Sequence, residues 1–398
     1  MSSKKSVADL LTRSVDQILP NKEKLRKLIE KRKIRLYLGI DPTSSKLHLG
    51  HTIQLRKLQA FADLGHQAIL VFGTGTVLVG DPSERITGRK LITEKEVEKN
   101  IKTWKDQVRP IINFDMIKVR YNSDWLTKLT LKDLIFIGSK ISAVQLFKRD
   151  NFQRRIKHGD TVWFHETMYP LLQGYDSVHL DVDLEIGGTD QTFNMLIGRE
   201  LQGKINKREK FVLTNRMIIG ADGKLMSKTA GNFIWLKDRP ENMFGKLMKI
   251  KDELLPQYFE FLTDKPISEI REMRKEIERE KINPMILKKE LALTIVSQFH
   301  GKKKAVQAQE EFEQVFQKRQ PPKSLPTFPL SQLPENPVVV SVLLTATGLV
   351  SSKSKAKRLA GQGGVKLDNK VIIDTQKKLK IKKDFIIQIG KRKFLKFL

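Results

Sequence analysis

Apolar and polar positions alternate with two different periods between residues 34 and about 235. Residues 50–64 carry apolar side chains at helical spacing, and this helix pattern ends at Gly65. Apolar runs of strand length are expected at Ile34–Ile40, Gln67–Gly73, Met116–Tyr121, Val178–Leu184 and Phe211–Thr214. Buried strands alternating with helices predict an α/β fold with a parallel sheet covered on both faces. On such sheets, ligands bind beyond the carboxyl ends of the strands.

The pattern becomes helical from Pro240 to Gln320. Asn283-Pro284 is expected to begin a clear helix, with Asn as the cap and Pro in the first turn. The six prolines of residues 321–337 predict a stiff, extended linker. With 398 residues the chain is too long for one ordinary domain. We expect a first domain over 1–238 with an N-terminal helix and an inserted helical segment at about 122–176, an α-helical domain over 239–320, the linker, and a small α+β domain over 338–398.

Charge adds a preference for polyanionic partners. Lys plus Arg number 74 against 45 Asp plus Glu, a net charge of +29. A basic proteome or simple solubility would also account for this excess. The absence of cysteine excludes disulfides, thiolate zinc sites and a cysteine nucleophile. No apolar run approaches the roughly 20 residues of a membrane span, and the first residues lack the apolar core of a signal peptide. We therefore expect a soluble, cytoplasmic protein.

The segment Asp41–His51 follows the first predicted strand and leads into the first helix. The N–H groups and partial positive charge of a helix start suit phosphate, and Gly50 removes a side chain where a nucleotide would approach. His48 and His51 are three residues apart and flank the same turn, so both imidazoles can donate to a phosphoryl group. The pair could instead only cap the helix. A metal site is disfavoured because acidic and Cys partners at suitable spacing are missing.

A second candidate segment, Asp222–Thr229, follows the last predicted strand. Its Gly and small polar residues predict a mobile loop. From such a loop Lys224 and Lys228 can reach the same phosphate and neutralise a leaving pyrophosphate. Taken alone, the stretch favours a basic surface loop.

Three polar residues share one face of a predicted helix. Tyr169, Gln173 and Asp176 are spaced by four and three residues on an otherwise apolar segment. A hydroxyl, an amide and a carboxylate there could form a small polar pocket that penalises a ligand lacking a matching group. The alternative is a solvent-exposed polar stripe.

Taken together and in this order, the two segments resemble the paired signatures of class I aminoacyl-tRNA synthetases. His48–His51 matches the first signature and Leu225–Thr229 the second. Leu225 stands where the family usually has lysine. Lys224 is the candidate substitute, and the position of Lys228 is intact.

Further segments narrow the resemblance to bacterial-type tyrosyl-tRNA synthetases over nearly the whole chain. They are Tyr37-Leu-Gly-Ile-Asp-Pro-Thr43, Val79–Pro82 and Gly187–Gln191. Tryptophanyl-tRNA synthetases usually have Gln-Pro in place of Asp41-Pro42, and they lack both the polar helix face and the tail. The resemblance implies a Rossmann-like catalytic domain, an α-helical domain and a small S4-like RNA-binding domain.

The resemblance also implies a role for each site residue. His48, His51 and Lys228 would be catalytic, and Arg89 with Lys90 would help with pyrophosphate. The ATP site would contain Asp41, Thr43, Gly50, Asp190, Lys224, Ser227, Lys228 and Thr229, with Asp190 on the ribose. The tyrosine site would contain Tyr37 and Asp176 for the substrate hydroxyl, Tyr169, Gln173 and Asp81 for its amino group, and Gln191 for its carboxylate.

The last 61 residues carry 15 Lys/Arg and 3 Asp/Glu. They are expected to form two short helices and a hairpin with an Asp-Asn turn. One helix, capped by Ser352, presents Lys353, Lys355, Lys357 and Arg358 for RNA phosphates. A merely solvated basic tail is the alternative, and the regular apolar positions argue against it.

The expected activity is tyrosine–tRNA ligation. Tyrosine attacks the α-phosphate of ATP, pyrophosphate leaves, and the adenylate is transferred to the 3′-terminal adenosine of tRNA(Tyr). Mg²⁺ would accompany ATP as substrate, with no metal site of the protein and no tightly bound cofactor. L-tyrosine, ATP and tRNA(Tyr) would be the partners, and a homodimer without membrane contact is implied by resemblance. The rival is a non-catalytic RNA-binding protein built on a degenerate synthetase, against which the intact His48, His51 and Lys228 stand.

Overall fold

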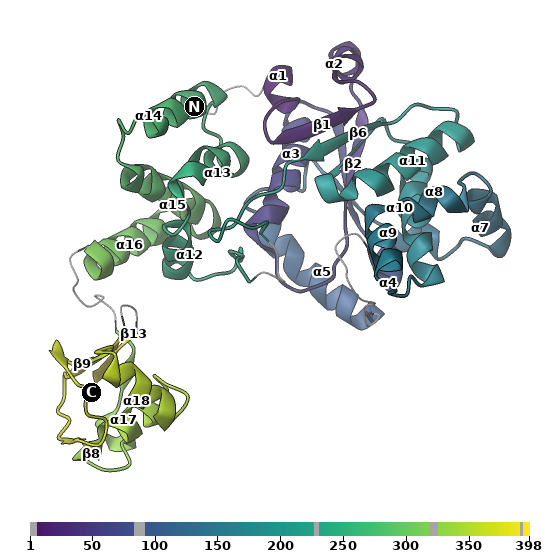
Figure 1. Cartoon of the computed structure of the whole chain (residues 1–398). Helices are drawn as coiled ribbons and strands as arrows, with labels where there is room; N and C mark the ends of the chain where they lie inside the picture. Colours follow the sequence, from purple (N-terminus) through teal and green to yellow (C-terminus); the bar gives the residue numbers. More distant parts are fainter. Residues whose placement is uncertain (1–5, 83–91, 227–230, 318–324, 391–392) are drawn as a thin grey trace. The chain divides into compact units, whose positions relative to one another are not determined.

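The chain folds into two compact units, Met1–Gly301 and Lys302–Leu398 (Figure 1). The computed structural model describes residues 6–82, 92–226, 231–317, 325–390 and 393–398. Within these ranges, no helix is long and apolar enough to cross a membrane.

A six-stranded sheet forms the centre of the first unit, in the order β1-β6-β5-β2-β3-β4. The strands are β1 (Val15–Leu19), β2 (Arg35–Ile40), β3 (Gln67–Phe72), β4 (Lys118–Tyr121), β5 (Leu184–Gly188) and β6 (Phe211–Asn215). Strands β2 to β6 run parallel, as the alternating pattern predicted. The edge strand β1 was not expected and pairs antiparallel with β6.

The strand expected at Val178–Leu184 is wrong. Helix α10 continues to Leu180, Asp181 leaves it in a left-handed conformation with φ of 47°, and the strand begins only at Leu184. Val178 and Leu180 are buried as the inward face of that helix. A short apolar run fits a buried helix turn as well as a strand, so periodicity could not separate the two.

Helices cover both faces of this sheet, since the residues of β5 and β6 are buried on both sides. Helix α3 packs on one face, and α10 and α11 pack on the other (Figure 1). The helices up to α11 are α1 (Val7–Leu10), α2 (Lys22–Lys31), α3 (Thr52–Asp63), α4 (Thr76–Val79), α5 (Glu94–Val108), α6 (Ser123–Leu126), α7 (Leu131–Gly138), α8 (Ala143–Phe147), α9 (Asp150–Lys157), α10 (Phe164–Leu180) and α11 (Thr192–Ile205). Helices α6 to α10 therefore lie in the connection between β4 and β5.

The helical segment of the first unit contains α12 (Pro240–Leu247), α13 (Leu255–Leu262), α14 (Ile267–Glu278) and α15 (Pro284–His300). Asn283 caps α15 by accepting from the backbone N–H of Met285, which confirms the predicted start. The segment belongs to the same compact unit as the sheet, not to a unit of its own.

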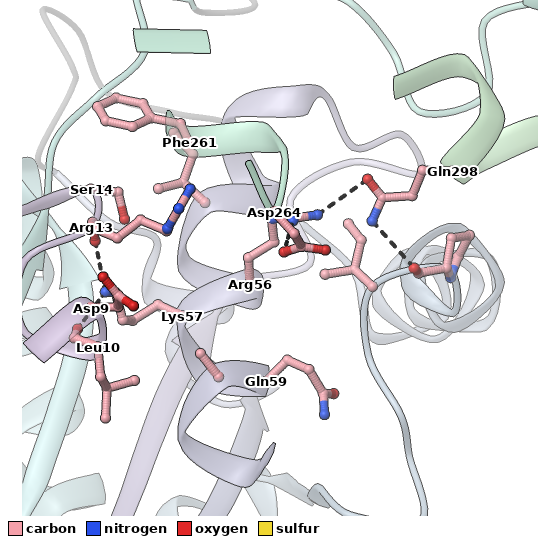
Figure 2. A pocket seen from close by; sticks show the side chains of 14 residues that line it. Asp9, Leu10, Arg13, Ser14, Arg56, Lys57, Gln59, Phe261, Asp264 and Gln298 are labelled. Atoms are coloured by element: carbon pink, nitrogen blue, oxygen red, sulfur yellow. Dashed lines mark hydrogen bonds and ion pairs between the residues drawn. The ribbon is translucent and has the colours of Figure 1, made fainter. Parts of the chain in front are cut away.

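A small pocket of about 190 Å³ lies where this helical segment meets α1 and α3 (Figure 2). Arg56 of α3 donates to Asp264 at 2.5 Å and to Gln298 of α15 at 3.2 Å. Arg13 donates to the backbone carbonyls of Glu260 and Thr263. The hydrogen bonds of Arg13 and Arg56 thus connect the helical segment to the sheet domain.

The second unit begins with α16 (Lys302–Phe312) and a π-helical turn, η4 (Glu313–Gln317). Its five-stranded sheet has the order β10-β9-β12-β13-β7. The strands are β7 (Thr327–Phe328), β9 (Val365–Leu367), β10 (Lys370–Val371), β12 (Ile386–Ile389) and β13 (Lys393–Phe397), with a separate pair of β8 (Val338–Val339) and β11 (Lys378–Leu379). Helices α17 (Val340–Ala346) and α18 (Lys353–Gly361) supply buried residues to the same apolar core. The two predicted helices and the hairpin are present.

The segment expected to be a linker is partly folded. β7 pairs in parallel with β13, and the backbone N–H of Leu330 donates to the carbonyl of Leu398 at 3.0 Å. Phe328, Leu330 and Leu333 pack against the apolar core of the unit. The described part of the proline-rich stretch, residues 325–337, therefore belongs to the small domain, because its apolar side chains find partners there. Residues 318–324 lie outside the described ranges.

Candidate active site

A cavity of about 490 Å³ lies beyond the carboxyl ends of β2, β3 and β5, as expected for a sheet of this kind. Helix α10 and the turn before α3 complete its wall. Of the predicted site residues, its wall contains Asp41, Thr43, His48, Gly50, His51, Asp81, Tyr169, Gln173, Asp176, Asp190 and Gln191. The predicted polar face of α10 therefore lies on a cavity and not on open solvent.

The two histidines of the first signature form one turn at the cavity wall. His48 precedes the 3₁₀ turn η1 (Leu49–His51) and His51 is its last residue, with the ring centroids 3.9 Å apart. His48 Nδ1 accepts from the backbone N–H of Gly50 at 3.2 Å. A neutral imidazole that accepts at Nδ1 carries its proton on Nε2, which makes His48 a hydrogen-bond donor through that nitrogen.

The absence of a side chain at Gly50 has a structural cause that the sequence did not predict. A Cβ at this position would meet His48 Cε1 at 2.9 Å and Nδ1 at 3.0 Å. The glycine therefore makes room for the imidazole of His48. That it also leaves room for a ligand stays a prediction.

Asp41 is held at the end of β2 by two hydroxyls. Tyr169 donates to Asp41 Oδ2 at 3.0 Å, and Thr76 donates to Oδ1 at 2.8 Å. A Cβ on Gly73 would come within 1.8 Å of Asp41 Oδ1. The position of Asp41 thus requires a glycine at position 73. The two residues are close because β2 and β3 are neighbouring strands that end side by side.

Asp176 lies deep in the wall, with 3% of its surface exposed. Trp125 Nε1 donates to Oδ1 at 2.9 Å, and Asn122 Nδ2 donates to Oδ2 at 3.0 Å. Burial raises the pKa of the Asp176 carboxyl well above its usual range, while these two hydrogen bonds act in the opposite direction. Both donors were missed by sequence reasoning, since they come from the connection after β4.

Tyr37 lies close to the cavity, but it is fully buried and does not form part of the cavity wall. Its hydroxyl lies 3.0 Å from Ser177 Oγ, and burial with the nearby Glu185 raises its pKa. Ser177 contacts the Tyr37 hydroxyl, while Asn122 and Trp125 donate to Asp176. The predicted role of Tyr37 and Asp176 on a substrate hydroxyl stays a prediction.

A buried ion pair lies next to Tyr37 and was not predicted. Lys210 Nζ donates to Glu185 Oε2 and, at 2.8 Å, to Ser177 Oγ. Gln173 Nε2 donates to Glu185 Oε1 at 3.1 Å. A signal was present in the sequence, because Glu185 interrupts the apolar run Leu184-Glu-Ile186 and Lys210 directly precedes another.

Asp81 lies on the cavity wall and accepts hydrogen bonds from two other segments of the chain. Arg149 donates to Asp81 Oδ1 at 3.1 Å and Gln191 donates to Oδ2 at 2.7 Å. Gln191 also donates to Asp190, whose pKa is raised by burial and by the charge of Asp81. Sequence reasoning did not include Arg149, which lies between the short helices α8 and α9.

The second signature segment is only partly described. Residues 218–226 form a tight hairpin, in which Gly220 donates to the carbonyl of Lys224 at 2.7 Å and Met226 donates to that of Ile218. The backbone groups of this first half are thus partly paired within the hairpin, and the predicted mobility of the loop stays a prediction. Met226 lines the cavity, whereas Lys224 is exposed and does not. Ser227, Lys228 and Thr229 lie outside the described residues, as do Arg89 and Lys90.

In the second unit, α18 carries the predicted basic residues Lys353, Lys355, Lys357 and Arg358, all exposed. Ser352 caps the helix by accepting from the N–H of Lys355 at 3.2 Å. Ala356 and Ala360 face the apolar core, so the cations lie on the solvent side.

Comparison with known proteins agrees with this geometry. Residues 29–317 match the family model of tRNA synthetases class I (W and Y). A tyrosine–tRNA ligase of Thermotoga maritima is 42% identical over 386 residues, covering 97% of this chain and 95% of the relative. Tyrosine–tRNA ligase 2 of Vibrio cholerae is 40% identical over 395 residues, covering 99% and 98%.

Solved structures show the same fold at lower identity. A C-terminally truncated mitochondrial tyrosyl-tRNA synthetase of Aspergillus nidulans gives a TM-score of 0.66 at 22% identity, covering 77% of this chain and 93% of that one. A tyrosyl-tRNA synthetase of Archaeoglobus fulgidus, solved with L-tyrosine, gives 0.61 at 20% identity, covering 75% and 98%. Since the family model and the near-complete relatives agree, the chain belongs to the class I tRNA synthetases of the tryptophan and tyrosine type and, among them, to the bacterial-type tyrosine–tRNA ligases.

Proposed function

We propose that this tyrosine–tRNA ligase activates L-tyrosine with ATP in the cavity beyond β2, β3 and β5. The observation that carries the proposal is that one cavity is lined by both the His48–His51 turn and the polar face of α10. The first suits the phosphates of a nucleotide and the second suits a small polar amino acid.

The tyrosine end of the cavity offers complementary groups. Gln173 Oε1 is buried and has no hydrogen-bond partner among the described residues, and Asp81 and Tyr169 lie on the same wall. We propose that these groups hold the substrate ammonium, that Gln191 holds its carboxylate, and that Asp176 accepts from its phenol. Tyr37 then acts from behind the wall, next to Asp176.

At the nucleotide end, the tyrosine carboxylate attacks the α-phosphate of ATP and the bond to pyrophosphate breaks. His48 donates through Nε2 to the phosphate oxygens as negative charge builds on them, and His51 acts beside it. Asp190, Asp41 and Thr43 would contact the nucleoside. Mg²⁺ enters with ATP as part of the substrate. Lys228 with Ser227, Thr229 and Lys224 would stabilise the leaving pyrophosphate, a role carried over from the family signature alone.

In the second step, the 3′-terminal adenosine of tRNA(Tyr) attacks the adenylate carbonyl and releases AMP. The exposed cations of α18 provide contacts to RNA phosphates that position the tRNA without reading its bases. Because tRNA and ATP are its substrates, we place the enzyme in the cytoplasm.

We also propose a homodimer. Large apolar side chains are exposed on α7, on α8 and at the start of α10, and α7 and α8 each pack against α10. They are Leu131, Ile135, Phe136, Val144, Phe147, Trp163 and Phe164, the last with 81% of its surface exposed. A patch of this kind favours a protein partner. Phe164→Asp should shift the sedimentation coefficient from dimer to monomer, and a monomeric wild type would contradict the proposal.

Tyrosine-dependent exchange of labelled pyrophosphate into ATP tests the activation step. Exchange should require tyrosine, and it should be lost in His48→Ala and Lys228→Ala. Folded protein that gives no exchange would support the rival RNA-binding role. Exchange driven by tryptophan in place of tyrosine would refute the assignment of the pocket. Unchanged exchange in Lys228→Ala would refute the role of that lysine.

A further inference from the structure

A buried cluster of hydrogen-bond donors and acceptors lies at the tyrosine end of the cavity, where Glu185 lines the wall and Lys210 and Ser177 lie behind it. Lys210 and Ser177 are fully buried and Glu185 is 2% exposed. Lys210 Nζ donates to Glu185 Oε2 and to Ser177 Oγ, and Glu185 Oε1 faces Gln173 Nε2 at 3.1 Å. The three residues come from β5, α10 and the residue before β6.

The charge of this cluster decides which way the Gln173 amide points. A lysine ammonium has only hydrogen-bond donors, and a carboxylate has only acceptors. With Lys210 on one oxygen of Glu185, the other oxygen must accept from Gln173, so the NH₂ group of Gln173 points to Glu185. The carbonyl Oε1 of Gln173 is left as a buried acceptor that no group in the described part of the chain contacts by a hydrogen bond.

We propose that Glu185 and Lys210 are positioning residues for tyrosine recognition, which fix Gln173 with its carbonyl oxygen as the acceptor for the substrate ammonium. This inference rests on the proposed function of the cavity. It adds two positioning residues to the proposed site, since neither residue needs to touch the reacting atoms. Gln173 would otherwise be free to present either end of its amide, and a cationic substrate group is recognised by only one of them.

Glu185→Gln tests the inference because it keeps the shape and removes the charge. Lys210 can only donate, so the new amide must turn its oxygen to Lys210 and its NH₂ group to Gln173. Gln173 must then turn its own oxygen away from the cavity and present a donor to the substrate ammonium. We expect KM for tyrosine to rise about 10- to 100-fold, the range for a lost hydrogen bond to a charged group. KM for ATP should stay within about twofold and kcat within a few-fold, because ground-state tyrosine binding is affected.

Adding Lys210→Met to Glu185→Gln gives the sharper test. Without the ammonium, the amide at position 185 can again turn its oxygen to Gln173, since Ser177 can donate or accept. The double variant should therefore recover at least about fivefold in KM for tyrosine relative to the single Glu185→Gln variant. A merely structural role predicts the opposite, a second loss added to the first.

Asp183→Asn is the matched control. Asp183 is 3% exposed, directly precedes β5 and pairs with Arg32 and Arg208, but it does not line the cavity. Its variant should lose thermal stability while keeping KM for tyrosine. An unchanged KM in folded Glu185→Gln, or no recovery in the double variant, would overturn the inference. Wild-type protein without tyrosine-dependent exchange would instead overturn the proposed function, so the two failures are distinguishable.

Discussion

Replacing Trp125 by Phe isolates one hydrogen bond behind the tyrosine pocket. The ring would keep its place, where Trp125 packs in the apolar cluster with Tyr37 and stacks on His179 with centroids 4.4 Å apart. Only the indole N–H is lost, and with it the 2.9 Å hydrogen bond to Asp176 Oδ1. Asp176 would then keep the single hydrogen bond from Asn122 that is described.

The expected magnitude follows from the charge and burial of the acceptor. Hydrogen bonds to charged groups contribute about 1.5–3 kcal/mol, which corresponds to roughly 10- to 100-fold in kcat/KM for tyrosine. Phenylalanine has no hydroxyl to contact Asp176, so its kcat/KM should fall much less. The preference for tyrosine over phenylalanine should therefore narrow by about the same factor.

The variant should also respond to pH in a defined direction. Burial raises the pKa of Asp176 and the bond from Trp125 lowers it, so the loss of Trp125 raises the pKa further. At a given pH, a larger share of Asp176 is then protonated than in the wild type. Because the ionised carboxylate is the stronger acceptor for a phenol, part of the lost activity should return as the pH is raised.

Pyrophosphate exchange at varied tyrosine and phenylalanine measures these effects. Trp104→Phe is the control, because it also loses an indole hydrogen bond, a partly buried one of 2.6 Å to the carbonyl of Ser44, away from Asp176. It should leave the ratio of tyrosine to phenylalanine unchanged. If folded Trp125→Phe keeps the wild-type ratio, Asp176 does not hold the substrate hydroxyl.

Three further predictions concern other parts of the chain. Burial and the charge of Lys33 lower the pKa of His66 to about 4. Below about pH 6.5 the unfolded chain therefore binds more protons than the folded chain, and the free energy of unfolding falls from there towards pH 4. Between pH 7 and 5, the melting temperature of His66→Gln should drop less than that of the wild type. Gly73→Ala places a Cβ 1.8 Å from Asp41 Oδ1 and should lower kcat/KM for tyrosine at least about tenfold in the exchange assay, while a fully active variant would contradict the role of Asp41. Lys355→Glu with Arg358→Glu should raise KM for tRNA about tenfold and flatten its salt dependence, with pyrophosphate exchange unchanged; equal losses in both assays would place α18 outside tRNA binding.

Local sequence determined those features whose partners lie within a few residues. Asn283 and Pro284 fix the start of α15, because a cap contacts only the first turn. Asp368 and Asn369 both take positive φ, 45° and 66°, and produce the predicted hairpin turn between β9 and β10. The common face of Tyr169, Gln173 and Asp176 follows from helical spacing alone. The signature segments identified the family, since they are read directly from residue order.

The tertiary structure decided which groups meet across long separations. Sequence spacing gave no partner for Glu185 or for Asp176. The parallel pairing of β5 with β6 brings the segment after Lys210 beside Glu185, and the connection after β4 brings Trp125 to Asp176. A charged residue inside an apolar run signals that a buried partner is needed, but strand order and register choose that partner, and neither is encoded in the pattern of a single strand. The helical spacing of Tyr169, Gln173 and Asp176 therefore predicted the polar wall of the cavity, whereas the buried ion pair of Lys210 and Glu185 appeared only in the folded sheet.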